Sequence, residues 1–259
     1  MLYDAVRSLQ NMPLWQAVLW LTGVNVGTFL AALGVGELLT RRFGENRVGP
    51  APGPLTGIEI WLAGVCVALN AGVAVAGVIL WREGVIDLRA YGDYSALTVI
   101  ADALVLFVAM DFAMYVFHRV AHHPAVYAYA HRTHHVYENP RPLTLFVLNP
   151  AEVLGFGALW LVVLTLYASS IEGILVYLAF NLAFGLVAHL GVEPAPRLWV
   201  RLPLLRYVST STFHAEHHAD RFHNFGFYLL VWDRLFGTLS PDYLADFSQA
   251  TAAAAPASR

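Results

Sequence analysis

Five long apolar stretches limit this chain to one kind of architecture. A helix needs about 20 apolar residues to cross the hydrocarbon core of a bilayer, and such stretches run over residues 14–39, 58–81 and 96–117. Residues 153–189 are long enough for two more helices, with a turn at 169–172. Only 13% of the residues are charged, against about 25% in a soluble domain. The sequence therefore predicts an all-α, polytopic membrane helix bundle with about five spans, and it leaves room for one helix that is only half-inserted.

The arginines predict how these spans are oriented. Cytoplasmic loops of membrane proteins carry an excess of basic residues, and all fifteen basic residues of this chain are arginines. Arg7, Arg82 and Arg89 lie on one side of the predicted bundle, and all the others lie on the side where the first, third and fifth spans end. We therefore expect the N-terminus outside and the C-terminus in the cytoplasm. The short loops and the lack of lysine favour a bacterial inner membrane.

All eleven histidines lie between residues 118 and 223, on the predicted cytoplasmic side. H-R-V-A-H-H ends the third span, H-R-T-H-H follows it, H-L-G-V-E ends the fifth span, and H-A-E-H-H lies beyond. Residues three and four apart share one face of a helix, so each H-x-x-H-H group is expected to point its imidazoles at one place. Imidazole is a good ligand for Fe, Zn, Cu and Ni. The nine best-placed histidines are too many for one ion and predict a pair of ions; they are His118, His122, His131, His134, His135, His189, His214, His217 and His218.

These elements resemble the histidine boxes of the fatty acid hydroxylase/sterol desaturase superfamily. H-R-V-A-H-H-P-A-V-Y-A-Y-A-H-R-T-H-H is similar to its first two boxes, and H-A-E-H-H is similar to its third. An H-x-G-x-E element at 189–193 lies between boxes two and three, as in that superfamily. An Asn-x-Gly at 224–226, a Trp-Asp at 232–233 and a Phe-Gly-Thr at 236–238 follow the third box. The likeness runs over about residues 111–238.

The resemblance implies a non-heme di-iron enzyme that uses O2 to hydroxylate, or desaturate, a C–H bond of a membrane lipid. It implies that the nine histidines are the catalytic metal ligands for two iron ions, and zinc can substitute in purified material because imidazole binds both metals. We prefer hydroxylation, the simpler outcome. The lipid is left open between a sterol, a hopanoid, a fatty acyl chain, an ether lipid and an aminolipid. We expect electrons from a separate ferredoxin- or cytochrome b5-like protein, because no soluble segment is long enough for a fused donor domain.

A further set of residues is expected to hold these ligands in place. Ala215 stands where many relatives have an acid, so the carboxylate that orients a histidine is absent or comes from elsewhere. Intramembrane acids are functional candidates, and Asp111 lies two turns before His118, where it could bond a histidine or an arginine. Each candidate also has a plain structural interpretation, such as capping a helix. The set is Asp111, His123, Glu193, His223 and Asp233.

The chain divides into three predicted parts. Residues 1–95 carry the first two spans, residues 96–240 form the histidine-box region, and residues 241–259 are expected to be a disordered tail because they are mostly small and polar. A single cysteine, Cys66, excludes a disulfide within the chain, and a net charge of -3 gives no sign of nucleic acid. The oligomeric state is not predicted.

Other functions compete with the oxidative enzyme. A histidine-lined metal transporter would need polar residues through the depth of the bilayer, whereas these histidines gather at one end of the spans. A heme-binding electron carrier would need isolated histidine pairs rather than H-x-x-H-H groups. The remaining alternative is a catalytically inactive family member that keeps the metal site for its structure.

Overall fold

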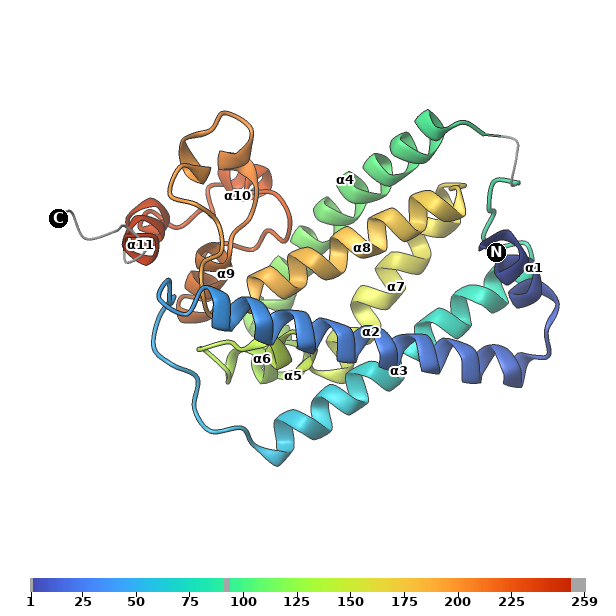
Figure 1. Ribbon diagram of the computed structural model, residues 1–259, viewed down its shortest axis with the longest axis horizontal. Helices are drawn as coiled ribbons and strands as arrows, with labels where there is room; N and C mark the ends of the chain where they lie inside the picture. Colours follow the sequence, from blue (N-terminus) through green and yellow to red (C-terminus); the bar gives the residue numbers. More distant parts are fainter. Residues whose placement is uncertain (1, 91–93, 253–259) are drawn as a thin grey trace.

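The chain folds into an elongated bundle of long helices that is covered at one end by short ones (Figure 1). The computed structural model describes residues 2–90 and 94–252, and this part of the chain is all-helical apart from loops and three isolated β-bridges. The predicted all-α class is confirmed. The elements are α1 (Leu2–Asn11), α2 (Leu14–Arg42), α3 (Gly57–Arg82), α4 (Ala96–Ala121), α5 (Pro124–Ala130), α6 (Arg132–His135), η1 (Pro142–Phe146), α7 (Pro150–Leu166), α8 (Ile171–Ala188), η2 (Trp199–Arg201), η3 (Leu205–Tyr207), α9 (Ser211–Ala219), α10 (Val231–Phe236) and α11 (Tyr243–Ala250).

The five predicted apolar stretches are five helices of the bundle. In the described part of the chain, α2, α3, α4 and α8 are long and apolar enough to cross a membrane, and α7 is a shorter apolar helix. At 1.5 Å per residue, α7 is about 25 Å long, slightly less than the hydrocarbon core. The helix bounds agree with the predicted stretches to within a few residues. The protein is an integral membrane protein.

Capping side chains fix where these helices begin. Thr56 accepts a hydrogen bond from the backbone N–H of Glu59, and the Glu59 carboxylate accepts one from the backbone N–H of Thr56, which completes a capping box before α3. Ser95, Asn149 and Ser170 accept backbone N–H groups in the first turns of α4, α7 and α8. Each cap satisfies a donor that the helix itself leaves unpaired.

The two ends of the bundle differ in chemistry. The loop after α3 and the turn between α7 and α8 meet at one end, where Leu88 bridges Ser169 and Arg89 pairs with Asp102 at 3.3 Å. The histidines gather at the opposite end, because α4 and α8 run in the same direction and finish there. The alternating direction of the helices thus brings the histidine boxes together at one end of the membrane-spanning part.

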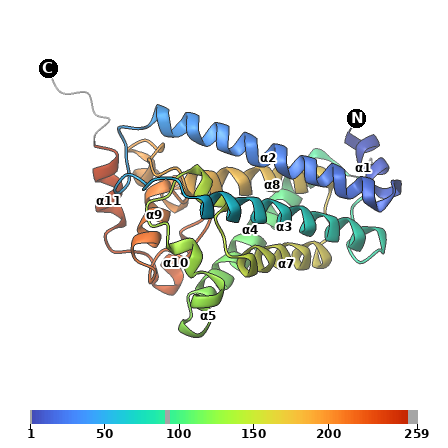
Figure 2. The same ribbon diagram turned by 90° about the horizontal axis from the view of Figure 1, so that it is seen from below.

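The short helices α5, α6, α9, α10 and α11 cover the histidine end as a cap (Figures 1 and 2). Phe213 of α9 packs in a buried cluster with Leu230, Tyr243 and Phe247. The last two residues belong to α11, so the prediction of a disordered tail from residue 241 is wrong for this helix. Tyr243 and Phe247 lie four residues apart and form one apolar face, a signal that the polar composition of the segment conceals. Residues 253–259 of the predicted tail lie outside the described residues.

A short helix precedes the first span and was not predicted. In α1, Leu2, Val6 and Leu9 lie at helical spacing on one face. An Arg82 guanidinium nitrogen at the end of α3 donates to the backbone carbonyl of Leu9. This contact attaches α1 to the end of the bundle opposite the histidines.

Candidate metal centre

The nine predicted ligands form two adjacent groups. One group holds His118, His122, His131, His135 and His217, and the other holds His134, His189, His214 and His218; within each group the ligand nitrogens lie within 4.8 Å of one another. The groups touch, because the rings of His135 and His218 stack with 5.0 Å between their centroids. All nine imidazoles are buried except that of His122, which is partly exposed. The arrangement offers two separate sets of ligands.

Each H-x-x-H-H box is divided between the two groups, which corrects the expectation that a box points at one place. His131 and His135 belong to the first group, whereas His134 belongs to the second. In α9, His214 and His218 belong to the second group and His217 to the first. Residues four apart stay closely aligned on a helix, whereas a residue three apart is displaced to the other side of that line. Each box therefore contributes to both groups and joins them rigidly.

Backbone carbonyls set the orientation of the imidazole rings. His134 Nδ1 donates to the carbonyl of Val147 at 3.2 Å, and His189 Nδ1 donates to that of Gly185 at 2.8 Å. In the first group, the Nδ1 atoms of His118 and His217 donate to the carbonyls of Phe225 (2.9 Å) and His223 (2.7 Å). A carbonyl oxygen can only accept, so these four Nδ1 atoms carry the proton and the Nε2 atoms present lone pairs.

These lone pairs face one another, and their spacing indicates whether the residues fit a metal ion. The Nε2 atoms of His134 and His189 lie 3.3 Å apart although neither carries a proton. Two lone pairs at this distance repel unless a cation lies between or beside them. At a metal–nitrogen distance of about 2.1 Å, neighbouring ligands on one ion lie roughly 3.0–3.4 Å apart. The donor set therefore fits metal ions and not a hydrogen-bonded polar core.

A buried carboxylate that the sequence analysis missed lies against the first group. His131 Nδ1 lies 2.8 Å from Oε1 of Glu152, and both side chains are almost completely buried. Glu152 lies in the first turn of α7, three residues after Asn149, whose side chain caps that helix. A carboxylate behind a ligating imidazole fixes the ring and raises its basicity. Glu152 thus takes the role that Ala215 leaves vacant, and the signal for it was an acid at the start of an apolar span.

The three predicted supporting acids hold backbone segments and do not touch the imidazoles. Asp111 accepts hydrogen bonds from Tyr228 N–H at 2.9 Å and Trp232 Nε1 at 2.9 Å, so the expected bond to a histidine or an arginine is wrong. Glu193 accepts from the backbone N–H and the hydroxyl of Thr212, in the first turn of α9. Asp233 accepts from backbone N–H groups of the loop after α9. A buried carboxylate without hydrogen-bond partners is destabilising, and the backbone N–H groups of a tight loop supply such partners.

Asp233 still positions one of the ligands through the backbone. The donors bound by Asp233 are the N–H groups of Phe225 and Gly226, at 2.8 and 2.7 Å, and Phe225 supplies the carbonyl that holds His118. A Cβ on Gly226 would lie 2.7 Å from both Oδ2 of Asp233 and the carbonyl oxygen of Leu229. The Asn-x-Gly and Trp-Asp elements of the sequence therefore belong to one folded loop that supports His118.

The two remaining candidate histidines differ from each other. His123 caps α5 by accepting the N–H of Ala125, and it belongs to neither metal group. His223 contributes its backbone carbonyl to His217, while its own ring pairs with Asp220 at 2.7 Å. Sequence patterns cannot reveal this role, because any residue at position 223 has the carbonyl.

Burial keeps the imidazoles outside the membrane-spanning helices neutral. Desolvation lowers the pKa of His135 and of His189 to about 4. The pKa values of His131, His134, His214, His217 and His218 are also lowered well below the usual histidine value, by burial first and then by neighbouring histidines. A neutral imidazole is the form that binds a metal. The ligands are therefore available at neutral pH without losing a proton.

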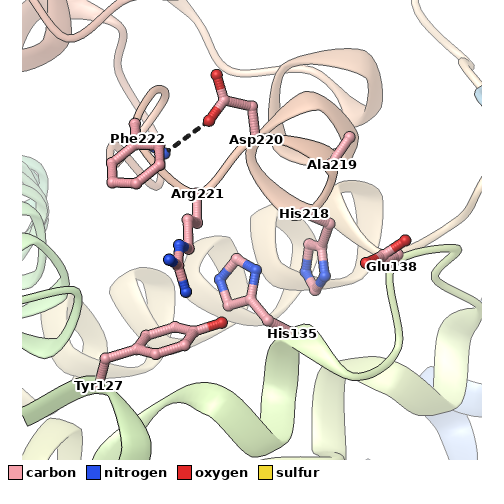
Figure 3. Close-up of a pocket in the computed structure, with 8 residues that line it drawn as sticks. All are labelled: Tyr127, His135, Glu138, His218, Ala219, Asp220, Arg221 and Phe222. Atoms are coloured by element: carbon pink, nitrogen blue, oxygen red, sulfur yellow. Dashed lines mark hydrogen bonds between the residues drawn. The ribbon is translucent and has the colours of Figure 1, made fainter. Parts of the chain in front are cut away.

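One pocket reaches both groups from outside (Figure 3). It has a volume of about 310 Å³, and His135 and His218, one from each group, lie side by side in its wall. The guanidinium of Arg221 lies over the ring of Tyr127, 4.9 Å from its centroid. The pocket is large enough for a small polar molecule and gives it access to both sets of ligands.

The fold and the site together define a class: membrane helix bundles with a histidine-rich candidate metal centre at one end. The family model for fatty acid hydroxylase matches residues 103–238, which span every histidine box. This chain belongs to the fatty acid hydroxylase family. The predicted resemblance is confirmed.

Curated relatives match about half of the chain. It is 33% identical to the very-long-chain aldehyde decarbonylase GL1-1 of Oryza sativa subsp. indica, over 53% of this chain and 23% of that protein. It is 27% identical to methylsterol monooxygenase 1 of Danio rerio, over 48% of this chain and 42% of that protein. The match thus spans less than half the length of these two relatives. No solved structure matches the chain significantly.

Proposed function

We propose that this protein is an O2-dependent, non-heme di-iron oxidoreductase that hydroxylates a C–H bond of a membrane lipid. The observation that carries the proposal is the set of nine imidazoles in two groups, with unprotonated nitrogens facing one another. Each group would hold one iron ion. When bound, the iron pair supplies the activation of O2, which no amino-acid side chain can provide.

The residues of the chain would hold, orient and shield this centre. Backbone carbonyls fix the rings of His118, His134, His189 and His217, and the Glu152 carboxylate lies behind His131. The cap covers the ligands, which keeps bulk water from the reacting atoms. Because the groups lie at the ends of apolar helices, a lipid chain can approach from the bilayer without crossing water.

The names of the relatives support lipid substrates and oxidative chemistry. A methylsterol monooxygenase inserts oxygen, as its name says, which favours hydroxylation over desaturation. The lipid itself stays open among sterol, hopanoid, fatty acyl chain, ether lipid and aminolipid. Desaturation is the alternative outcome of the same centre.

The proposal includes a location and a partner. The excess of arginine at the histidine end favours a cytoplasmic metal centre. The short loops and the lack of lysine favour a bacterial inner membrane. Electrons would come from a separate ferredoxin- or cytochrome b5-like protein.

Metal analysis of variants tests the centre. The parent should hold about two irons per chain, one for each group. His217→Ala removes a ligand from the first group and His134→Ala one from the second, so each variant should lose about one ion first. His123→Ala is the matched control, because this histidine lies outside both groups, and it should keep both ions. No metal in the parent, or metal that survives both ligand changes, would contradict the di-iron proposal and favour the transporter.

Product analysis then tests the reaction. Iron-loaded protein is supplied with a lipid extract, O2 and a chemical reductant, and the lipids are compared by mass spectrometry. A lipid that gains one oxygen atom supports hydroxylation, whereas a lipid that loses two hydrogen atoms indicates desaturation. A metal-loaded parent that changes no lipid would contradict the oxidative function while leaving the metal centre intact.

A further inference from the structure

One face of the cap combines exposed apolar side chains with arginines. Leu204 is 82% exposed and Leu235 is 67% exposed, which is costly for leucines in water. Two segments make up this surface, residues 197–206 before α9 and residues 231–236 of α10. We call it the cap face; it consists of Leu198, Leu202, Leu204, Val231, Leu235 and Phe236 with Arg197, Arg201, Arg206 and Arg234.

The two segments form one continuous surface. Leu230 N–H donates to the carbonyl of Tyr207 at 2.8 Å, and Arg234 donates to the carbonyl of Arg206 at 3.2 Å. The guanidinium groups of Arg206 and Arg234 both lie 4.8 Å from the ring centroid of Tyr207. In Figure 1, α10 and the orange segment before α9 lie together at the histidine end of the bundle.

The cap face lies at the depth of a membrane span. Trp232 of α10 donates to Asp111 of α4 at 2.9 Å, and the ring of Phe236 stacks on Tyr115, with centroids 5.5 Å apart. Asp111 lies ten residues before the end of α4, which is about 15 Å along the helix axis. Phe112 and Val116 are exposed on the same part of α4. The helix α10 therefore packs beside a stretch of α4 that faces lipid.

The charge of the cap face has one sign. Its four arginines have no ion pair among the described residues, and Asp233 is the one acid of the two segments. That acid is fully buried against backbone N–H groups, so the surface keeps the full positive charge. Exposed leucines among arginines are typical of segments that lie in the membrane interface and attract anionic lipids.

We propose that the cap face lies in the interface of the bilayer leaflet at the histidine end and binds the headgroups of anionic phospholipids. The leucines and Phe236 enter the upper acyl region, and the arginines contact the phosphates. The α9 helix begins at Ser211, shortly after the first segment of this face. Binding to the leaflet therefore holds the third histidine box against the membrane end of the bundle. The proposal does not depend on metal or on catalysis.

A fluorescent label reports the environment of this face. The single cysteine is buried, so Cys66→Ala provides a background for Leu204→Cys and Leu235→Cys labelled with an environment-sensitive dye in nanodiscs. Asp242→Cys, at an exposed charged residue before α11, is the matched control in water. Both leucine positions should show a blue-shifted emission and be quenched several-fold more by nitroxide-labelled lipid than by iodide. The control should show the reverse order.

Lipid charge tests the arginines. Phosphatidylglycerol added to phosphatidylcholine discs should increase the blue shift at residue 204, and Arg197→Gln, Arg201→Gln and Arg206→Gln together should remove that increase. A label at 204 and 235 that emits like the label at 242, and that iodide quenches, would overturn the proposal and identify the face as a surface for a soluble partner. A blue shift at residue 204 that does not change with lipid charge would overturn the proposed contact between the arginines and the headgroups.

Discussion

At the scale of single residues, the state of the histidine nitrogens decides what this site is for. A buried histidine usually finds a donor or acceptor for each ring nitrogen. Here the carbonyls of Val147 and Gly185 take the Nδ1 protons of His134 and His189, which leaves two bare Nε2 atoms 3.3 Å apart. Such a pair is unfavourable without a cation. The arrangement is therefore evidence about function that composition and spacing cannot supply.

Glu152→Gln should weaken metal binding without unfolding the protein. The neutral amide keeps the size of the side chain but loses the negative charge behind His131, and changes of this kind cost about 10- to 100-fold in metal affinity. A chelator competition titration measures the effect. Asp102→Asn is the matched control, because this buried carboxylate lies at the opposite end of the bundle and holds the backbone N–H of Ser170. Equal metal affinity in both variants would show that Glu152 does not tune His131.

Gly226→Ala should lower both the thermal midpoint and the metal content. Its Cβ would lie 2.7 Å from Oδ2 of Asp233 and from the carbonyl oxygen of Leu229, so the loop that holds His118 must shift. In contrast, Gly27→Ala in α2 meets nothing within 4 Å and should be neutral or stabilise by up to about 1 kcal/mol. Thermal denaturation in detergent compares the two. A Gly226→Ala protein with the parent's midpoint and metal content would mean that the loop can relax.

At the scale of elements, the sequence predicted the long helices well and the cap poorly. The long apolar helices were visible because a bilayer demands runs of apolar residues, and the caps at Thr56, Ser95 and Ser170 confirm their starts. The cap helices are short and are held by contacts between segments that are distant in the sequence. One example is the buried cluster that contains Phe213 and Phe247. The two H-x-x-H-H boxes are each divided between the two groups, because a second set of ligands lies on the other side of each helix, and the sequence pattern does not show where that set lies.

Phe247→Ala should destabilise the cap strongly. Phe247 is fully buried against Phe213 of α9, and removal of a buried phenylalanine ring costs about 3–5 kcal/mol. A loss of this size corresponds to a fall of the thermal midpoint on the order of 10 °C. Leu244→Ala on the same helix removes a side chain that is 55% exposed and should change the stability by less than about 0.5 kcal/mol. Similar midpoints for the two variants would mean that α11 does not support α9.

At the scale of the whole molecule, the buried histidines should make the metal-free protein sensitive to acid. Burial holds the pKa of His135 and of His189 near 4, and five other imidazoles of the cap are shifted in the same direction. In the unfolded chain these groups take up protons below about pH 6.5. Between these limits the unfolded state binds more protons than the folded state, so the free energy of unfolding falls as the pH falls. Each such histidine contributes a slope of about 1.4 kcal/mol per pH unit.

Three acids outside the spans oppose this effect but are outnumbered. The pKa of Glu216 is raised to about 7, and the pKa values of Glu193 and Asp233 are raised as well, in each case mainly by burial, so their protonation stabilises the folded state as the pH falls. Seven histidines outweigh three acids, and the thermal midpoint of chelator-treated protein in detergent should be clearly lower at pH 5.5 than at pH 7.5. Metal-loaded protein should have the higher midpoint at pH 7.5, because the metal binds the neutral imidazoles of the folded state. That advantage should shrink at pH 5.5. A midpoint of the chelator-treated protein that is constant or rises toward pH 5.5 would mean that the imidazoles are already protonated in the folded protein. Protonated imidazoles do not bind metal, so this result would contradict the assignment of the two groups as metal sites.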